Sequence, residues 1–569
     1  MVGAIRTLHR AARPLGGLIA GTVVAAILAG CNGPENLLVK EEKVYDADSF
    51  LSRNLHPTVH FPSGLTLNFP GYVVGIEKIS RSIIGPDPAV VNKYLIEHAA
   101  NADDEDDLQN LRGKLFREPK AMTVTQILRY ASIGAKSPQP DGTPVTSSLP
   151  GRIDACFLYS IYEKRGDLKP EATGPAPSRP CPAVNGKAIN VTEKGNPLDV
   201  PAPVHAWEHG LKALDRLADY AKADIAESAK TDRPYTHLLV FAMGWNTDQF
   251  EALRNFNSIA NEFARAVEGC PVPNDNYCKA AHKIRPLVIV LTWPSLWDWS
   301  NLLAVGGFDA LAKLASFPIK ASDAREVGFG PANYLINKAL AKIVTDDDLK
   351  RDLKAKDVEL KVVGVGHSFG ARLLAQSARS ARYLTPSQRT AGPGGLDIFF
   401  ALQGAFEIDR LFDGDGRRHS CITPTRQLAA GFNRVVLTAS KGDGAVNLAF
   451  FGTYAGQHDG YLASSKEAAY CELFAQGIMD ENGACLDKAG NRQTCAALAP
   501  APEKGRPRVL YLDASDSIKY NTHRTGGGSH SDIYRENVGR VLANLLNSSD
   551  KLANCEGKDV TFSAFCQGK

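Results

Sequence analysis

The pentapeptide Gly366-His367-Ser368-Phe369-Gly370 places a serine between two glycines in the pattern G-x-S-x-G. A serine hydroxyl is a weak nucleophile and becomes reactive when a nearby histidine takes its proton. A carboxylate behind the histidine fixes the imidazole tautomer and stabilises the imidazolium. If Ser368 is a nucleophile, the chain must also supply a histidine and an acid, and an acyl-enzyme would form that water releases.

The residues on either side of the motif strengthen this interpretation. The apolar run 361–365 is typical of a buried strand, and the run 371–375 has the spacing of an amphipathic helix. A sharp turn between strand and helix presents Ser368 at the top of a sheet, and crowding there requires small residues at Gly366 and Gly370. The helix N-terminus favours the negative charge that develops during attack. The segment resembles the nucleophile elbow of the α/β-hydrolase superfamily of esterases and lipases.

The resemblance implies an oxyanion hole of two backbone N–H groups, each of which can stabilise the oxyanion by ~3 kcal/mol. One donor belongs to the residue after the nucleophile, and the other to a loop that follows an earlier strand. By position these are Phe369 and Trp245, which follows the apolar run 237–242. Related enzymes often have His-Gly where this chain has Met243-Gly244, so the backbone donors are kept and a histidine side chain is missing.

The resemblance also implies the chain order serine, acid, histidine. Asp443 follows the apolar run 435–439 in a loop with two glycines, which is the usual place of the acid, after the seventh strand. We therefore expect Asp443 to be the triad acid. Asp409 and Asp413, which come after the preceding strand, are the alternatives.

The general base is expected at His530. It follows the last apolar run, 509–512, across a loop with three consecutive glycines, and it opens the final helix. His523 is the alternative. His367 adjoins the nucleophile, so its side chain should point away from the serine oxygen, and we interpret it as a packing residue of the elbow.

Two further segments could lie near the site. The turn Thr292-Trp293-Pro294-Ser295 is similar to a Trp-Pro-Ser turn in a group of bacterial α/β-hydrolases, and a proline turn beside a core tryptophan is an equal alternative to a direct role. The apolar residues of 296–356 fit either a lid or the core, and the cysteine-containing stretch 445–505 could rim the site.

The elements that must position these residues alternate between apolar strands and amphipathic helices. Strands are expected at 237–242, 287–292, 360–365, 398–402, 435–439 and 509–512, with a further candidate strand at 156–162, and helices at 204–226, 248–268, 369–383 and 532–546. This alternation predicts the α/β class, with a mainly parallel central sheet flanked by helices. The resemblance makes this an α/β-hydrolase fold.

The domain organisation is expected to be as follows: a signal peptide (1–30), a tether (31–55), an N-terminal accessory region (56–200), a catalytic domain (201–548) with insertions at 296–356 and 445–505, and a C-terminal tail (549–569).

The N-terminus carries three arginines and then the apolar run 16–28, which is too short for a comfortable membrane span. Leu28-Ala29-Gly30-Cys31 resembles the lipobox of bacterial lipoproteins, which implies that Cys31 is acylated and becomes the new N-terminus. Acyl chains would hold the protein on a membrane of the cell envelope, facing the periplasm or on the cell surface. Asn32 weakly favours the outer membrane in a Gram-negative source.

The rest of the composition limits partners and cofactors. The formal net charge is +3, and beyond the N-terminal arginines basic and acidic residues are equal in number, so nucleic acid is not an expected partner. Without Cys31 ten cysteines are left, an even number that suits disulfides in an oxidising compartment, with Cys156 and Cys181 as one of several possible pairs. No metal or other cofactor motif occurs, and the oligomeric state is open.

We therefore expect a serine hydrolase that cleaves carboxylic esters, including lipid or envelope esters. Two alternatives are an acyltransferase and a lipid-anchored binding protein with a degenerate hydrolase domain, for which the substituted Met243 is the motivating feature.

Overall fold

The structure is a computed structural model, and all of its described residues belong to the unit His56–Lys569. The described residues are 67, 69–80, 120–132, 153–160, 181, 206–245, 247, 249–268, 283–295, 309–383, 395–411, 432–447, 454–466, 474–482, 484–493, 509–520 and 528–546. The expected signal peptide, tether and C-terminal tail, and with them Cys31, lie outside these residues.

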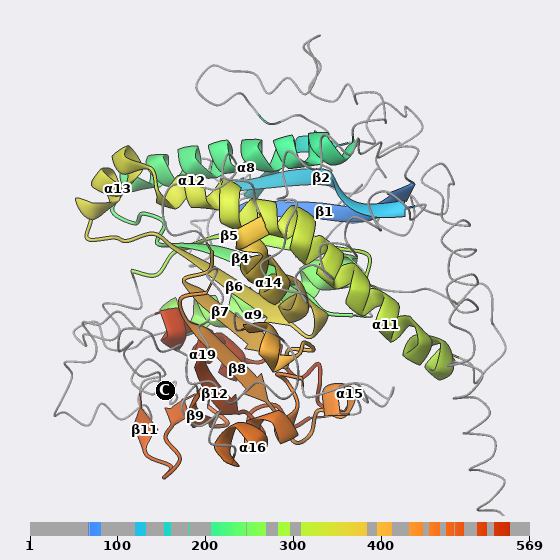
Figure 1. Ribbon diagram of the computed structural model, residues 1–569. Helices are drawn as coiled ribbons and strands as arrows, with labels where there is room; N and C mark the ends of the chain where they lie inside the picture. Colours follow the sequence, from blue (N-terminus) through green and yellow to red (C-terminus); the bar gives the residue numbers. More distant parts are fainter. Residues whose placement is uncertain are drawn as a thin grey trace, which may run out of the picture. The chain divides into compact units, whose positions relative to one another are not determined.

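Twelve strands of the described residues join in one sheet (Figure 1). They are β1 (Gly71–Ser80), β2 (Lys120–Ser132), β3 (Ile153–Ser160), β4 (His237–Ala242), β5 (Pro286–Thr292), β6 (Lys361–His367), β7 (Ile398–Leu402), β8 (Val435–Ala439), β9 (Phe474–Met479), β10 (Cys485–Leu486), β11 (Arg492–Gln493) and β12 (Val509–Asp513). The order is β11-β10-β9-β12-β8-β7-β6-β4-β5-β1-β2-β3.

Parallel pairing runs without interruption from β9 to β1 in this order, and antiparallel strands extend both edges. The central strands β4, β6, β7 and β8 are apolar and almost wholly buried, as expected of parallel strands covered on both faces. The predicted α/β class with a mainly parallel sheet is confirmed.

The helices are α8 (Ala206–Ala229), α9 (Gln249–Glu268), α11 (Asp309–Val327), α12 (Ala341–Val344), α13 (Asp347–Lys354), α14 (Phe369–Arg379), α15 (Gly444–Asn447), α16 (His458–Lys466) and α19 (Glu536–Leu546). Two π-helical turns, η2 (Gly328–Ala332) and η3 (Leu335–Leu340), continue α11, and 3-10 turns follow at η4 (Ser380–Tyr383) and η5 (Ile408–Leu411). The predicted final helix begins at Glu536 rather than at 532, because residues 529–535 form turns.

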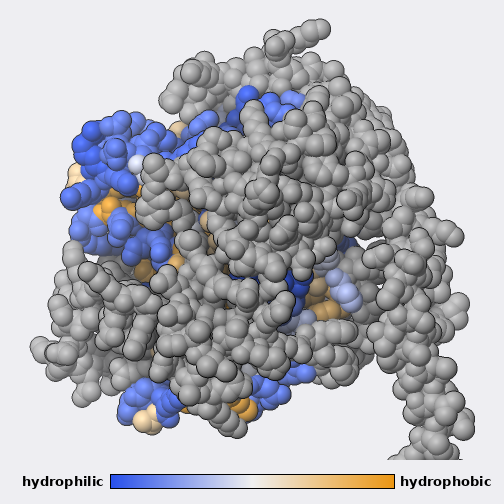
Figure 2. Space-filling model, in the orientation of Figure 1, coloured by the Kyte–Doolittle hydropathy of each residue, from blue (hydrophilic) through white to orange (hydrophobic). Residues whose placement is uncertain are grey.

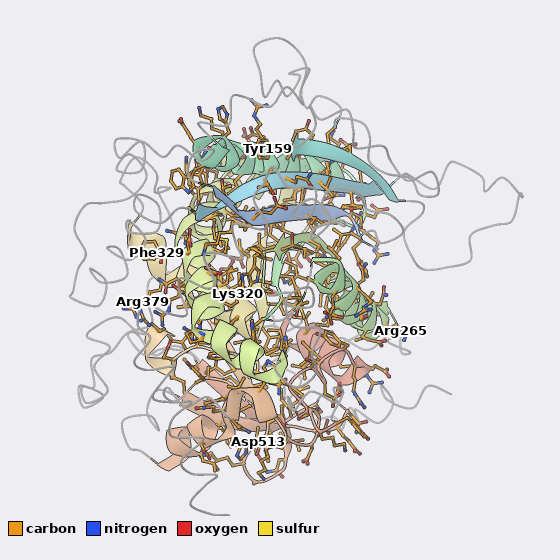
Figure 3. The ribbon with its side chains drawn as sticks, turned by 90° about the vertical axis from the view of Figure 1, so that its right-hand side faces the viewer. Tyr159, Arg265, Lys320, Phe329, Arg379 and Asp513 are labelled. Atoms are coloured by element: carbon orange, nitrogen blue, oxygen red, sulfur yellow. A yellow bond between two sulfur atoms is a disulfide. The ribbon has the colours of Figure 1, made fainter. Side chains whose placement is uncertain are left out.

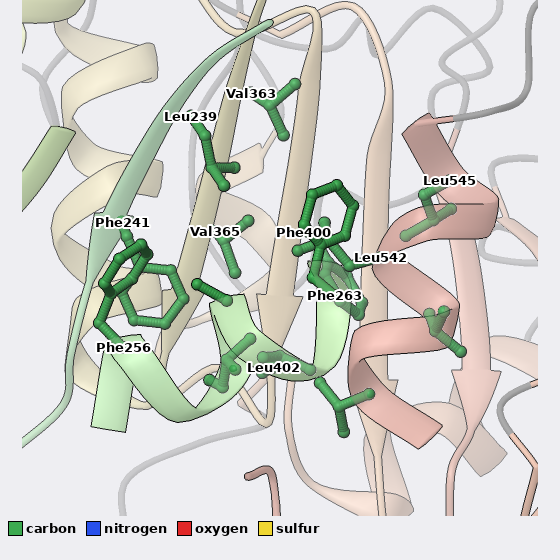
Figure 4. Packing of buried hydrophobic residues seen from close by; sticks show 14 of the residues in the cluster. Leu239, Phe241, Phe256, Phe263, Val363, Val365, Phe400, Leu402, Leu542 and Leu545 are labelled. Carbon is green, nitrogen blue, oxygen red and sulfur yellow. The ribbon is translucent and has the colours of Figure 1, made fainter. Parts of the chain in front are cut away.

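One face of the sheet is covered by α9 and α19, which also pack against each other (Figure 4). Alternate strand residues point to this face and are buried there, among them Phe241, Val363 and Phe400. The ring of Phe241 meets that of Phe256 on α9 edge to face, with centroids 4.9 Å apart. Burial of each such side chain contributes about 1.5–3 kcal/mol, which fixes the central strands against these helices.

The opposite face is covered by α14, α11 and α8. Helix α14 packs on β4, β6 and β7, α11 packs against α14, and α8 lies along β2 and β3 (Figures 1 and 3). The exposed side of α13 carries aspartate, lysine and arginine residues and forms a hydrophilic surface (Figure 2). No helix of the described ranges is both long enough and apolar enough to cross a bilayer.

The segments outside the central strands are parts of the same sheet. Strand β1 pairs with β5, so strands from the expected accessory region 56–200 continue the sheet. Strand β9, from the stretch 445–505, pairs in parallel with β12. Cys156 of β3 and Cys181 form a disulfide.

Candidate active site

Ser368 occupies a strained turn between β6 and α14. Its backbone angles are φ 55° and ψ −121°, a conformation that residues with a Cβ rarely adopt. The turn is tied to the loop after β7, since the Ser368 N–H donates to the Leu402 carbonyl at 3.1 Å and the Ser368 carbonyl accepts from Ala405 N–H at 3.1 Å. Such strain persists only where surrounding bonds enforce it, and it concentrates at functional sites.

The positions of Gly366, Gly370 and Gly244 leave no room for a side chain. A Cβ at Gly366 would lie 2.5 Å from the Ala371 Cα, and a Cβ at Gly370 would lie 2.0 Å from the Ala242 carbonyl oxygen. A Cβ at Gly244 would lie 2.5 Å from the Ser368 Cβ and 3.1 Å from its hydroxyl oxygen. The loop after β4 therefore abuts the serine itself.

The site lies where the direction of the sheet connections reverses. Strands β4 and β6 are parallel neighbours, but the chain leaves β4 toward β5 on one side and leaves β6 toward β7 on the other. In open parallel sheets such a switch point leaves a crevice beyond the carboxyl ends of the strands, where ligands bind. Ser368 follows β6 and Trp245 follows β4, so both stand at this point.

The expected acid and base lie in contact. His530 Nδ1 is 2.8 Å from Asp443 Oδ2, and Asp443 is fully buried. The backbone holds this pair as well, since Asp443 forms an isolated antiparallel bridge with Gly528 and the Ser529 N–H donates to the Gly442 carbonyl at 2.8 Å. With Nδ1–H donated to the carboxylate, Nε2 is the nitrogen that can accept a proton.

Asp443 is held by several donors besides His530. Its Oδ1 accepts the N–H groups of Ala445 and Val446 at 3.0 Å each, and its Oδ2 accepts the side-chain amide of Gln403 at 2.8 Å. Gln403 comes directly after β7, is fully buried and has φ 46°. Sequence reasoning missed this residue, and its place at the carboxyl end of a central strand was the available signal.

His367 connects the elbow to the loop of the histidine. Its Nε2 donates to the His530 carbonyl at 2.9 Å, and the two imidazole rings are 4.7 Å apart between centroids. Burial lowers the pKa of His367 well below its ordinary value, and the charge of a protonated His530 would lower it further, so the ring is neutral.

In the described part of the chain the Ser368 hydroxyl makes no hydrogen bond to His530. In ligand-free enzymes such bonds are often long and tighten when substrate binds.

The residues expected to supply the oxyanion donors lie beside Ser368. Phe369 is the first residue of α14, so its N–H has no partner within the helix. The ring centroids of Trp245 and Phe369 are 6.4 Å apart. The ring of Phe317 on α11 contacts both, with centroid distances of 5.6 Å to Trp245 and 4.7 Å to Phe369. Phe317 is partly exposed, so an apolar surface adjoins the two donors.

Arg372 and Glu407 form an ion pair that connects α14 to the segment after β7. The buried Arg372 of α14 donates from Nε to the Ala405 carbonyl at 2.7 Å and reaches Glu407 Oε1 at 3.5 Å, and Arg325 lies 3.4 Å from the same oxygen. Burial alone would raise the pKa of Glu407, but Arg372, Arg325 and Arg410 outweigh it and lower the pKa to about 2. Glu407 is therefore ionised at neutral pH.

Several sequence alternatives lie outside what is described. Asp413 and His523 are outside the described residues, as is the side chain of Asp409. Of the stretch 296–356, residues 309–356 are described; α11, η2 and η3 pack against α14, whereas α12 and α13 pack against α8. Among the described residues, no group of three or more His, Cys, Asp or Glu could hold a metal ion.

Comparison of the chain with models of protein families, with curated proteins and with solved structures found no match.

Proposed function

We propose that this chain is a serine hydrolase of the α/β-hydrolase type that cleaves carboxylic esters. The observation that carries the proposal is the hydrogen bond between His530 Nδ1 and the buried Asp443, beside a serine held at positive φ. The strand order around β4 and β6 supports it, because it brings all three residues to the carboxyl ends of parallel strands.

In the proposed reaction, His530 Nε2 removes the proton of the Ser368 hydroxyl as its oxygen attacks the ester carbonyl. The N–H groups of Phe369 and Trp245 donate to the tetrahedral oxyanion. The imidazolium, stabilised by Asp443, then gives its proton to the departing alkoxide, which leaves as an alcohol. Water attacks the acyl-enzyme with His530 again as base, and the carboxylic acid departs as Ser368 recovers its proton.

The surroundings of the serine favour an apolar group on the ester. Trp245 and Phe317 are partly exposed next to Ser368, and Tyr454 completes the aromatic cluster at 6.5 Å from Phe317. Aromatic surfaces of this kind attract alkyl or aryl groups through burial and ring stacking. Acylation of Cys31 would place such a site at a membrane of the cell envelope, so lipid or envelope esters are the proposed substrate class.

The test is labelling of the full chain with a fluorophosphonate, which reacts with activated serines. We expect covalent label on Ser368, no label in Ser368→Ala, and hydrolysis of p-nitrophenyl esters by the unsubstituted chain. A folded, disulfide-intact protein that takes no label and hydrolyses no ester would refute the proposal.

A matched pair of variants separates the triad from structural histidines. His458 Nε2 also binds a carboxylate, that of Asp513 at 3.0 Å, at the start of α16. We expect His530→Gln to abolish labelling and His458→Gln to keep it. Equal labelling of the two variants would remove His530 from the mechanism.

A further inference from the structure

The turn Trp293-Pro294-Ser295 after β5 is hydrogen-bonded to the loop after β4 on both sides of Gly244-Trp245. Trp293 Nε1–H donates to the Met243 carbonyl at 2.9 Å. The Ser295 hydroxyl donates to the Thr247 carbonyl at 2.5 Å and accepts the Thr247 N–H at 3.3 Å. All three bonds end on the main chain, so they fix the path of the loop whatever its side chains do.

The turn is itself held by a buried lysine on α11 (Figure 3). Lys320 Nζ donates to the Pro294 carbonyl at 2.8 Å and lies 3.3 Å from Asp323 Oδ2. The other oxygen of Asp323 accepts from Lys78 of β1 at 3.1 Å. Asp323 is fully buried and Lys320 is 7% exposed, so solvent screens this charge arrangement little.

These contacts form a continuous chain from the N-terminal strands to the candidate oxyanion hole. It runs from Lys78 through Asp323 and Lys320 to the Trp293-Pro294-Ser295 turn, and from there to the loop that carries Trp245. An oxyanion donor works only when it is aimed at the place where the negative charge develops. Misplacement by about 1 Å can lower a rate by a factor of about 100.

We propose that Trp293, Ser295 and Lys320 are positioning residues that set the backbone N–H of Trp245 for the oxyanion, and that β1 takes part through Lys78. The inference rests on the proposed hydrolase function. Because the oxyanion forms after substrate has bound, loss of the positioning lowers kcat and weakens binding of an oxyanion mimic, whereas KM changes little.

The experiment compares Ser295→Ala with Ser228→Ala in the full chain. Ser228 makes the same kind of contacts, donating to the Ile225 carbonyl at 2.7 Å and accepting the Tyr235 N–H at 2.9 Å, and it lies at the end of α8. We expect Ser295→Ala to lower kcat about ten- to hundred-fold, to weaken inhibition by a trifluoromethyl ketone by the same factor, and to change KM less than about twofold. Ser228→Ala should leave all three unchanged.

Variants of two buried lysines test the contact between Lys320 and the Trp293-Pro294-Ser295 turn. Lys338 of η3 is also buried, but it bonds to Asp215 of α8 rather than to the turn. We expect Lys320→Met to act on kcat and on the trifluoromethyl ketone as Ser295→Ala does, and Lys338→Met to affect only the thermal midpoint. Lys320→Arg, which keeps a charged donor, should restore part of kcat.

The outcomes distinguish this inference from the function on which it rests. If the unsubstituted chain neither labels at Ser368 nor hydrolyses esters, both are refuted. If it labels and Ser295→Ala matches Ser228→Ala in kcat and inhibition, the positioning role alone is refuted. A rise in KM with unchanged kcat would also refute it, because it would indicate a substrate contact instead.

Discussion

Gln403 and His530 donate to the same oxygen of Asp443, each at 2.8 Å. Two donors on one oxygen fix the orientation of the Asp443 carboxylate. The His530 imidazole is therefore aligned by Gln403, at the end of β7, as well as by its own loop. Gln403 has a φ of 46°, and its backbone N–H donates to the Thr438 hydroxyl of β8 at 3.0 Å, so its main chain and its side chain are both held at this place.

Gln403→Met should lower kcat about tenfold, because a hydrogen bond to a charged group contributes about 1.5–3 kcal/mol and its loss frees the carboxylate to rotate. Gln376→Met is the matched control, since Gln376 is also buried and its side-chain amide donates to Ser380 at 2.9 Å rather than to a carboxylate. Steady-state kinetics on a p-nitrophenyl ester measure both variants. Equal activity of the two would exclude an orienting role for Gln403.

Gly370→Ala should destabilise the protein by ~3 kcal/mol and abolish labelling of Ser368, because the new Cβ would collide with the Ala242 carbonyl. Gly330→Ala should change stability by no more than ~1 kcal/mol, because apart from its chain neighbours and its own helix backbone no atom lies within 4 Å of the added Cβ, and the gain in helix propensity is opposed by the contact with the ring of Pro331. Urea unfolding gives both values. A harmless Gly370→Ala would mean that the elbow is looser than described.

Acid should destabilise the fold through His237. Burial, and next the charge of Lys361, lower the pKa of His237 to about 3. The unfolded chain takes up a proton below its pKa of about 6.5 and the folded chain does not, so stability is complete above pH 6.5 and falls by up to ~1.4 kcal/mol per pH unit toward pH 3.

His237→Gln should remove this share of the pH dependence. Unfolding free energies at pH 7, 5.5 and 4.5 should fall less steeply in the variant, by up to ~1.4 kcal/mol per unit. His367, whose pKa burial also lowers, contributes with the same sign and remains in both proteins. Parallel curves would show that His237 is protonated in the folded state.

Phe317→Ala should change which esters are preferred. The ring lies against Trp245 and Phe369 and is partly exposed, so its loss removes apolar surface beside the serine. We expect kcat/KM for a long-chain or aryl ester to fall about tenfold, with a smaller effect on an acetate ester of the same alcohol. An equal fall for both esters would point to a structural role of the ring.

The central strands and the positions of the site residues could be predicted because the signals there are local. The strands 237–242, 398–402 and 435–439 are mainly apolar and have the bounds that the sequence predicts. Ser368 and Asp443 follow β6 and β8 closely, His530 follows β12 across a longer loop, and parallel strands bring their carboxyl ends together. His530 and Asp443 therefore meet although 87 positions separate them.

Among the outer strands, β3 overlaps the candidate strand 156–162, whereas the sequence did not predict β1, β2, β9, β10 or β11. Strand β2 buries Thr123, Thr125 and Gln126, so neither an apolar run nor a clean alternation marks it. Strands β10 and β11 have two residues each, too few for any period. Gln403 was missed because its role depends on a bond to a residue 40 positions away, which no local pattern reports.

The pairing of β1 with β5 sets an order of events during synthesis. Gly71 of β1 pairs with Val288 of β5, which the ribosome adds roughly 200 residues later. Until then, the edge of β1 that pairs with β5 has no partner strand. An open edge is a template for pairing with other chains, and the nascent protein needs shielding until β5 arrives. Expression from residue 201 onward would leave the edge of β5 without its β1 partner, so this part of the chain is unsuited to production as a separate fragment.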